Sequence, residues 1–195
     1  GICSTSRGDV FAVGQDGQQG AILHFDGQSW RQVAVGTIPI LQELWAFSPT
    51  NVFAVGNYGA ILHHNAQSWQ LMQSGTGNHL ISVWGFSPSD VFAVGYRGTI
   101  LHYDGTVWSV MQSGSNSDLK GVWGSSPSDV FAVGARGTIL RFDGQLWRSV
   151  SLINSSTTLT GIWGTSSSDI YAIGEGGAIL HYDGRMWTSM QSGTR

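Results

Sequence analysis

The stretch Val122-Trp123-Gly124-Ser125-Ser126-Pro127-Ser128-Asp129-Val130-Phe131-Ala132-Val133-Gly134 decides the fold, because nearly the same words recur along the chain. With the residues that follow it to Trp147, it has close copies at 83–108 and 162–187 and looser copies at 44–69 and 2–30. The tryptophans that end each copy are 39 or 40 residues apart, at Trp30, Trp69, Trp108, Trp147 and Trp187. Repeats therefore fill the sequence, at about 1–40, 41–79, 80–118, 119–158 and 159–195.

Each repeat predicts four short strands separated by turn signals. In the third repeat the strands fall at 80–84, 90–95, 99–103 and 107–111, and the sharpest turns are Tyr96-Arg97-Gly98 and Asp104-Gly105. A single four-stranded meander cannot bury both of its faces, so the repeats must stack on one another. The sequence therefore predicts an all-β, five-bladed β-propeller of four-stranded antiparallel blades, with about 39 residues per repeat, as one domain over 1–195.

The two ends of the sequence fit into the repeat. Gly1-Ile2-Cys3 aligns with Gly121-Val122-Trp123, and Gly193-Thr194-Arg195 falls a few residues before the next first strand would begin. A circle of five repeats is then almost complete, with an open arc or a ring shared between chains as alternatives. Because the chain does not begin with Met, we expect a processed product or an excised fragment.

The composition argues against several classes of partner and site. Charged residues make up 11% of the chain, against about 25% in an average globular protein. The net charge of −3 and the lack of a basic cluster argue against nucleic acid, which needs several Lys or Arg on one face. Cys3 is the only cysteine, so an intrachain disulfide and a cysteine-based zinc site are excluded.

Cellular location is read from the same composition. No apolar run is long enough to insert into a membrane, and no signal peptide is present. Low charge and nine tryptophans predict a secreted or cell-surface protein. Asn154-Ser155-Ser156 is a glycosylation sequon, which matters only in a eukaryotic secretory route.

The motifs at 84–108 are Trp-Gly-x-Ser-Pro-Ser-Asp-Val-Phe-Ala-Val-Gly, Gly-Thr-Ile-Leu-His-Tyr-Asp-Gly and a final Trp. Through these motifs the repeat resembles the short-repeat propellers of secreted bacterial proteins, which are related to BNR or Asp-box repeats. The Asp-box places its Asp five residues before its Trp, whereas Asp104 precedes Trp108 by four. The repeat also shows a looser similarity to propeller lectins, through the motifs Trp-Gly, Asp-Val-Phe, Gly, Asp-Gly and Trp. That similarity implies sugar binding in pockets between neighbouring blades.

Two groups of residues are candidates for ligand binding. The first group is Trp45, Trp84, Trp123 and Trp163, because an aromatic face suits the C–H face of a sugar ring; packing between blades is the alternative. The tryptophans that end the repeats are expected to pack. The second group lies in the variable second turn, where loop residues on a rigid scaffold often bind partners; solvated hairpin tips are the alternative. It consists of Tyr58, Tyr96, Arg97 and Arg136.

The recurring aspartates and histidines have structural interpretations. An Asp in an Asp-Gly turn fixes the turn by accepting backbone N–H groups. The histidines at 24, 63, 102 and 181 occupy equivalent positions in separate repeats, so they cannot converge on one metal ion and are expected to be hydrogen-bonded structural residues. The sequence predicts no catalytic residue, no metal site and no cofactor.

These observations favour a non-catalytic binding module. The leading hypothesis is lectin-like carbohydrate recognition at sites between blades. The alternative is a protein-interaction or assembly module of a larger secreted bacterial protein. An Asp-box hydrolase is the minority interpretation, since a glycosidase needs two carboxylates in unlike environments. The expected partner is a carbohydrate or a protein surface, and oligomers remain possible.

Overall fold

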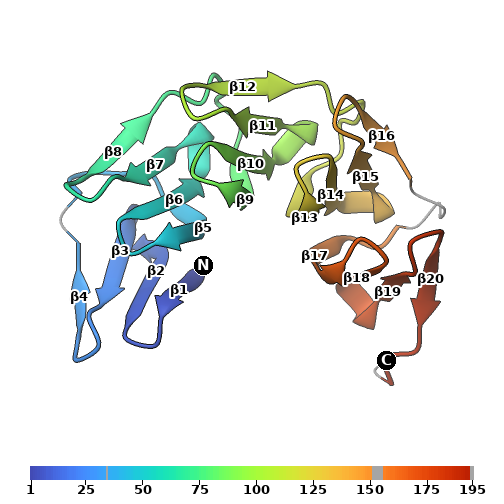
Figure 1. Cartoon of the computed structure of the whole chain (residues 1–195), viewed down its shortest axis with the longest axis horizontal. Helices are drawn as coiled ribbons and strands as arrows, with labels where there is room; N and C mark the ends of the chain where they lie inside the picture. The colour runs from blue at the N-terminus through green and yellow to red at the C-terminus, as the bar shows by residue number, and fades with distance from the viewer. Residues whose placement is uncertain (34, 151–155, 194–195) are drawn as a thin grey trace. The chain divides into compact units, whose positions relative to one another are not determined.

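The computed structural model describes residues 1–33, 35–150 and 156–193. Within them, twenty strands form five sheets of four, and the strands of every sheet follow one another in chain order (Figure 1). Each sheet is called a blade here and is numbered from the N-terminus. The predicted sequon begins at Asn154, so it lies largely outside the described residues.

The strands have similar bounds in every blade. Blade 1 has β1 (Ile2–Ser6), β2 (Asp9–Asp16), β3 (Gln19–Phe25) and β4 (Trp30–Gln32). Blade 2 has β5 (Leu41–Ser48), β6 (Asn51–Gly56), β7 (Ile61–His64) and β8 (Trp69–Met72). Blade 3 has β9 (Leu80–Ser87), β10 (Asp90–Gly95), β11 (Ile100–Tyr103) and β12 (Trp108–Met111). Blade 4 has β13 (Leu119–Ser126), β14 (Asp129–Gly134), β15 (Ile139–Phe142) and β16 (Trp147–Ser149). Blade 5 has β17 (Leu159–Ser166), β18 (Asp169–Gly174), β19 (Ile179–Tyr182) and β20 (Trp187–Met190).

The first strand of a blade is longer than the sequence predicts. In the third repeat the sequence predicts a strand over 80–84, but β9 continues past Gly85 to Ser87. In blade 4, β13 likewise continues past Gly124 to Ser126. Gly124 pairs with Val130, and after a bulge Ser126 pairs with Asp129, so the ladder runs to the hairpin turn. The glycine tolerates the bulge and therefore does not end the strand.

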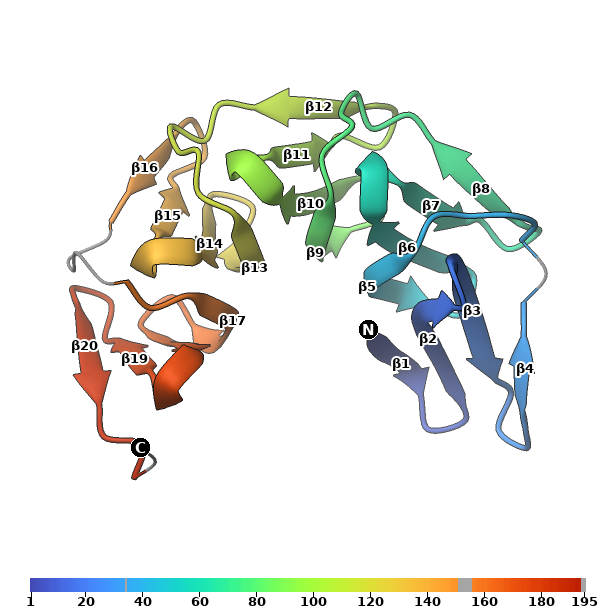
Figure 2. The same cartoon turned by 180° about the vertical axis from the view of Figure 1, so that it is seen from behind.

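The turn between the second and third strands takes two forms. In blades 2 to 5 it is one turn of 3-10 helix, drawn as a short coiled ribbon in Figure 2: η1 (Asn57–Gly59), η2 (Tyr96–Gly98), η3 (Ala135–Gly137) and η4 (Glu175–Gly177). In blade 1 this part of the repeat is three residues longer, with 14–20 in place of 56–59. The added residues extend the hairpin, so that Asp16 pairs with Gln19. Gly17, at φ 62°, makes this tighter reversal.

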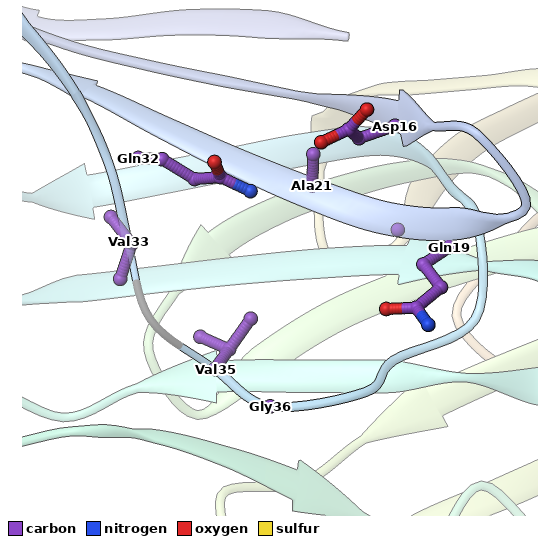
Figure 3. A pocket seen from close by; sticks show the side chains of 8 residues that line it. Asp16, Gln19, Ala21, Gln32, Val33, Val35 and Gly36 are labelled. Atoms are coloured by element: carbon purple, nitrogen blue, oxygen red, sulfur yellow. The ribbon is translucent and has the colours of Figure 1, made fainter.

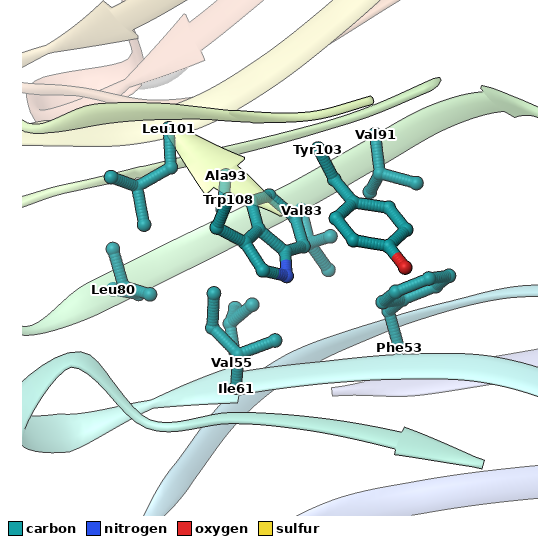
Figure 4. Packing of buried hydrophobic residues seen from close by; sticks show 10 residues of the cluster. All are labelled: Phe53, Val55, Ile61, Leu80, Val83, Val91, Ala93, Leu101, Tyr103 and Trp108. Atoms are coloured by element: carbon teal, nitrogen blue, oxygen red, sulfur yellow. The ribbon is translucent and has the colours of Figure 1, made fainter. Parts of the chain in front are cut away.

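The chain divides into two compact units, residues 1–93 with 101–110 and residues 94–100 with 111–195. In the first unit, the core packs Phe53, Val55 and Ile61 of blade 2 against apolar residues of blade 3 that include Tyr103 and Trp108 (Figure 4). Strand alternation accounts for this arrangement, since successive side chains point to opposite faces of a blade.

The second unit shows the same alternation in blade 4. Phe131 contacts the rings of Tyr182 and Trp187 in blade 5, with centroids 5.6 and 6.0 Å away. The neighbouring residues Val130 and Ala132 are also fully buried. A central strand buried on both faces reads as an unbroken apolar run, as the sequence indicated.

Five sheets of four antiparallel strands, with a repeat of about 39 residues, make the fold a β-propeller of five blades, as predicted. The single-domain assignment and the closure of the circle stay predictions.

Candidate functional site

The turns between the second and third strands hold exposed side chains in an unusual backbone conformation. Tyr58, Arg97 and Arg136 have φ of 57°, 57° and 59°, in the left-handed region. Blade 5 has Gly176 at the same place, with φ 64°. A non-glycine residue in this region costs about 1–2 kcal/mol because its Cβ approaches the following carbonyl oxygen. Three blades therefore carry a large side chain where glycine would be less strained.

Close contacts with the next connection fix these turns. A Cβ on Gly98 would clash with the carbonyl oxygen of Ser115, and one on Gly59 with that of Thr76. The N–H of Ala135 donates to the carbonyl oxygen of Asp118 at 2.8 Å. These contacts leave no room for the turn to relax, so the strained residue is held pointing outward.

The sequence-predicted turn residues are all at these tips, and they differ in environment. Tyr58 is 71% exposed, and its ring centroid is 4.9 Å from that of His79. Tyr96 is half-buried beneath the ammonium of Lys120, whose Nζ lies 4.2 Å from the ring centroid. Arg97 and Arg136 are exposed.

The two arginines differ in their backbone hydrogen bonds but are alike in their charged side chains. The carboxylate of Asp118 accepts the backbone N–H of Arg97 at 3.0 Å. Within the described residues, neither Arg97 nor Arg136 uses its guanidinium in an ion pair. Both charges are therefore available to a partner.

A hollow of about 330 Å³ lies beside the turn of blade 2. Its lining includes Pro39, Tyr58, Leu71, Met72 and Thr76. Tyr58 and Leu71 are both largely exposed at its edge. An exposed phenol and an exposed Leu beside one hollow offer a place for an apolar side chain of a partner.

Blade 1 has a hollow of similar size in the corresponding place, about 330 Å³ (Figure 3). Its rim carries Asp16, Gln19 and Gln32, and Val33 and Val35 supply the apolar part. The hollow therefore recurs between the second turn and the end of the fourth strand, but its chemistry changes from one blade to the next.

The four tryptophans predicted to bind sugar have three different environments. Trp45 and Trp84 are half-buried, and their rings lie against each other with centroids 4.2 Å apart. Trp123 is buried, and its Cη2 reaches the space beside Gly164. Trp163 is 59% exposed. The structure therefore does not gather these rings into one exposed surface in either unit.

The packing prediction for the tryptophans that end the repeats is confirmed in part. Trp108, Trp147 and Trp187 are buried. The prediction is wrong for Trp30, which is 47% exposed. Trp30 occupies the same register position in blade 1. Its ring contacts Phe25 of the same blade, with centroids 5.5 Å apart, but among the described residues of its unit no ring from another blade covers it as Phe53 covers Trp108.

The recurring aspartates and histidines form one pair per blade, which sequence reasoning missed. In each blade, the residue that opens the second strand is hydrogen-bonded to a residue of the third strand. The pairs are Asp9–His24 at 3.2 Å, Asn51–His63 at 3.2 Å, Asp90–His102 at 2.7 Å, Asp129–Arg141 at 2.7 Å and Asp169–His181 at 2.9 Å. The histidines are hydrogen-bonded as predicted. A comparison of repeats does not reveal the partnership, because the acid is replaced by Asn only in blade 2 and the His by Arg only in blade 4.

Each of these pairs also stacks on the aromatic residue of the second strand. The rings of Phe53 and His63 are 4.2 Å apart, and those of Tyr171 and His181 are 4.6 Å apart. The hydroxyl of Thr165, and then His181, hold the pKa of Asp169 below its usual value. Each acid is therefore occupied by framework hydrogen bonds, and within the described residues no three metal-binding side chains come together.

Glu43 is a half-buried acid that sequence reasoning also missed. Its Oε2 accepts the backbone N–H of Val83 at 2.8 Å, and burial raises the pKa of its carboxyl. Ser82, Gly121 and Gly161 hold the same repeat position. One acid among small residues is the signal that would have identified it. Its carboxylate links β5 of blade 2 to β9 of blade 3.

Comparisons with known proteins place the fold among β-propellers. No family model matches the chain, and no curated protein matches it. The solved structures with similar folds include YCF48 bound to D1 peptide, with 19% identity and a TM-score of 0.69 over 93% of this chain and 63% of that one. The WD40 propeller domain of Doa1 has 13% identity and a TM-score of 0.77 over 97% of this chain and 66% of that one. An ancestral GH74 enzyme has 13% identity and a TM-score of 0.74 over 97% of this chain and 30% of that one.

This chain thus spans less than two thirds of the length of the YCF48 chain. Identities this low show the fold alone. The β-propeller architecture is confirmed, and the finer resemblance to BNR or Asp-box repeats stays a prediction. Among the described residues, no helix is long and apolar enough to cross a membrane.

Proposed function

We propose that this chain is a non-catalytic protein-binding module whose partner docks on the turns between the second and third strands of blades 3 and 4. Both turns belong to the second unit. The observation that carries the proposal is the left-handed backbone of Tyr58, Arg97 and Arg136. Strain of this kind persists where the surrounding structure imposes it, and it is concentrated at binding and catalytic sites. Glycine at position 176 makes the same turn without the strain, so the large side chains do not serve the turn itself.

The chemistry of these turns favours an acidic protein segment. In the second unit the exposed residues Arg97 and Arg136 belong to η2 and η3, which contact β13 and β17. Lys120, on β13, adds an ammonium over Tyr96. Arginine binds carboxylates with two parallel hydrogen bonds, which gives geometric specificity as well as energy. A segment rich in Asp and Glu offers the matching groups.

Two further observations support a protein partner over a carbohydrate. The sugar-binding hypothesis relies on four tryptophans, and only Trp163 among them is largely exposed. Trp123 is buried, and Trp45 and Trp84 are packed on one another. One of the similar propellers is described as bound to a peptide. Carbohydrate recognition and a secreted or cell-surface location stay predictions.

A library of acidic peptides tests the proposal, with a glycan array run in parallel. We expect tight-binding peptides whose affinity falls by about tenfold or more, equivalent to about 1.4 kcal/mol, in Arg97→Gly and in Arg136→Gly. Both glycine variants should be at least as stable as the parent chain, because they relieve the strained φ. This separates lost binding from lost folding.

Arg185→Ala is the matched control, because Arg185 is an exposed arginine of the same unit but lies in the turn between the third and fourth strands of blade 5. Its peptide affinity should equal that of the parent chain. Equal losses in all three variants would show only a general charge effect and would overturn the proposal. So would a glycan that binds while every peptide fails.

A further inference from the structure

Blade 5 has an apolar face that its own unit leaves uncovered. Trp163, Tyr171 and Ile173 are 59%, 36% and 53% exposed. They lie side by side in the ladder, since Trp163 pairs with Tyr171 and Ile173 lies two residues further along the same face. We call these three residues the blade-5 end face. Contiguous apolar side chains of this size on a protein surface mark an interaction site.

The interior of each unit shows what covers this position in other blades. Phe53 and Val55 of blade 2 correspond to Tyr171 and Ile173, and both are fully buried. They pack against Val83, Tyr103 and Trp108 of blade 3 (Figure 4). Phe131 of blade 4 is likewise covered by Tyr182 and Trp187 of blade 5. The required partner is therefore the opposite face of a blade of this same repeat.

Blade 1 presents such a face, and it too is uncovered within its unit. Ile2, Leu23 and Trp30 are large apolar residues that are exposed. Ile2 and Leu23 both pair with Ala12, and Trp30 pairs with Phe25. The same register positions in blade 4 hold Val122, Leu140 and Trp147, which are buried. We call Ile2, Leu23 and Trp30 the blade-1 end face.

We propose that the blade-5 end face of one copy packs against the blade-1 end face of a second copy, so that the chains associate head to tail. The two end faces are unlike, so the contact is heterologous, and each copy of a pair keeps one end face free for a further copy. The chain itself supplies both halves of the contact. The ring of Tyr171 in one copy would pack against Phe25 and Trp30 of the second copy. In the same way, the ring of Phe53 packs against Tyr103 and Trp108 within one chain.

Sedimentation of the 195-residue chain over a wide range of concentration tests this contact. We expect association that increases with concentration, with a dissociation constant that Ile173→Asp raises by about tenfold or more. Val107→Asp is the matched control, because Val107 is 56% exposed, lies in the β11–β12 turn and belongs to neither end face. Circular dichroism should show both variants folded, since both side chains are exposed.

Mixing two variants tests the head-to-tail geometry. Ile173→Asp retains the blade-1 end face, and Ile2→Asp retains the blade-5 end face. Neither variant should associate alone, whereas an equimolar mixture should form a dimer that does not extend. A chain that stays monomeric at every concentration would overturn the proposal, whether or not blade 1 of the same chain covers Trp163. Association that survives in Ile173→Asp would overturn it as well.

Discussion

Arg141 Nε donates a hydrogen bond to Asp129 Oδ1 at 2.7 Å, in the register position where His102 meets Asp90 in blade 3. Asp129 is nearly buried, and its second oxygen accepts the hydroxyl of Ser125 at 2.6 Å. The pair therefore ties the second strand to the third, and to the end of the first, with charged hydrogen bonds. The base can change from His to Arg because both donate from the same strand position.

Asp129→Ala should lower the free energy of unfolding by about 2 kcal/mol, the contribution of a hydrogen bond to a charged group. Asp129→Asn should cost less, because an amide oxygen still accepts from the base, as Asn51 does with His63. Urea denaturation measures both, provided that the slope m stays constant. Equal losses in the two variants would contradict a hydrogen-bonding role.

Ala66→Gly should stabilise the protein by up to about 1 kcal/mol, because Ala66 has a φ of 77° where a side chain is unfavourable. The equivalent residue in blade 3 is Gly105, with φ 94°. Thermal unfolding of the single variant measures the gain.

The reverse change, Gly105→Ala, is the matched control and should destabilise the protein. A Cβ at that position would lie 2.7 Å from the Cβ of Ser89, in addition to the strained φ. If both substitutions shifted the midpoint in the same direction, backbone strain would not be the cause.

Trp108→Ala should cost about 3–5 kcal/mol, as expected for a large buried ring. The ring lies 5.2 Å from Tyr103 and 6.1 Å from Phe53. Trp30→Ala is the comparison, because Trp30 has the same register but is half exposed. It should cost less than half as much when measured at a concentration where the chain is monomeric. A similar loss for the two would contradict the difference in burial.

The pKa of Asp104 is lowered to about 2, first by the hydroxyl of Thr106 and then by two backbone N–H groups. Because this pKa is lower in the folded chain, ionised Asp104 stabilises the fold above the unfolded value near 4. That contribution is lost as the pH falls towards about 2. An NMR titration of the carboxyl carbons measures the pKa directly.

Thr106→Val should raise the pKa of Asp104, since the variant removes the hydroxyl donor. Asp143 is the internal control: its pKa is also lowered to about 2, chiefly by the backbone N–H of Leu146, and the substitution should leave it unchanged. A rise in both pKa values would indicate a general loss of structure.

The sequence by itself determined the repeat, the strands and the Asp-Gly turns. Those features rest on interactions between residues close together in the chain. In the Asp143 turn, for example, one carboxylate oxygen accepts the N–H groups of the residues two and three positions later. Such a turn forms wherever those residues occur, and so a short pattern is enough to predict it.

The tertiary structure alone decided which of the repeated side chains is free to bind. Trp30 and Trp108 stand at the same place in the same repeat, yet one is exposed and the other buried. Trp123 and Trp163 differ in the same way. The physical reason is that a side chain's exposure depends on the blade packed against it, which its own repeat does not encode. The left-handed φ of Arg97 likewise follows from a turn held by the next connection, through Ser115 and Asp118.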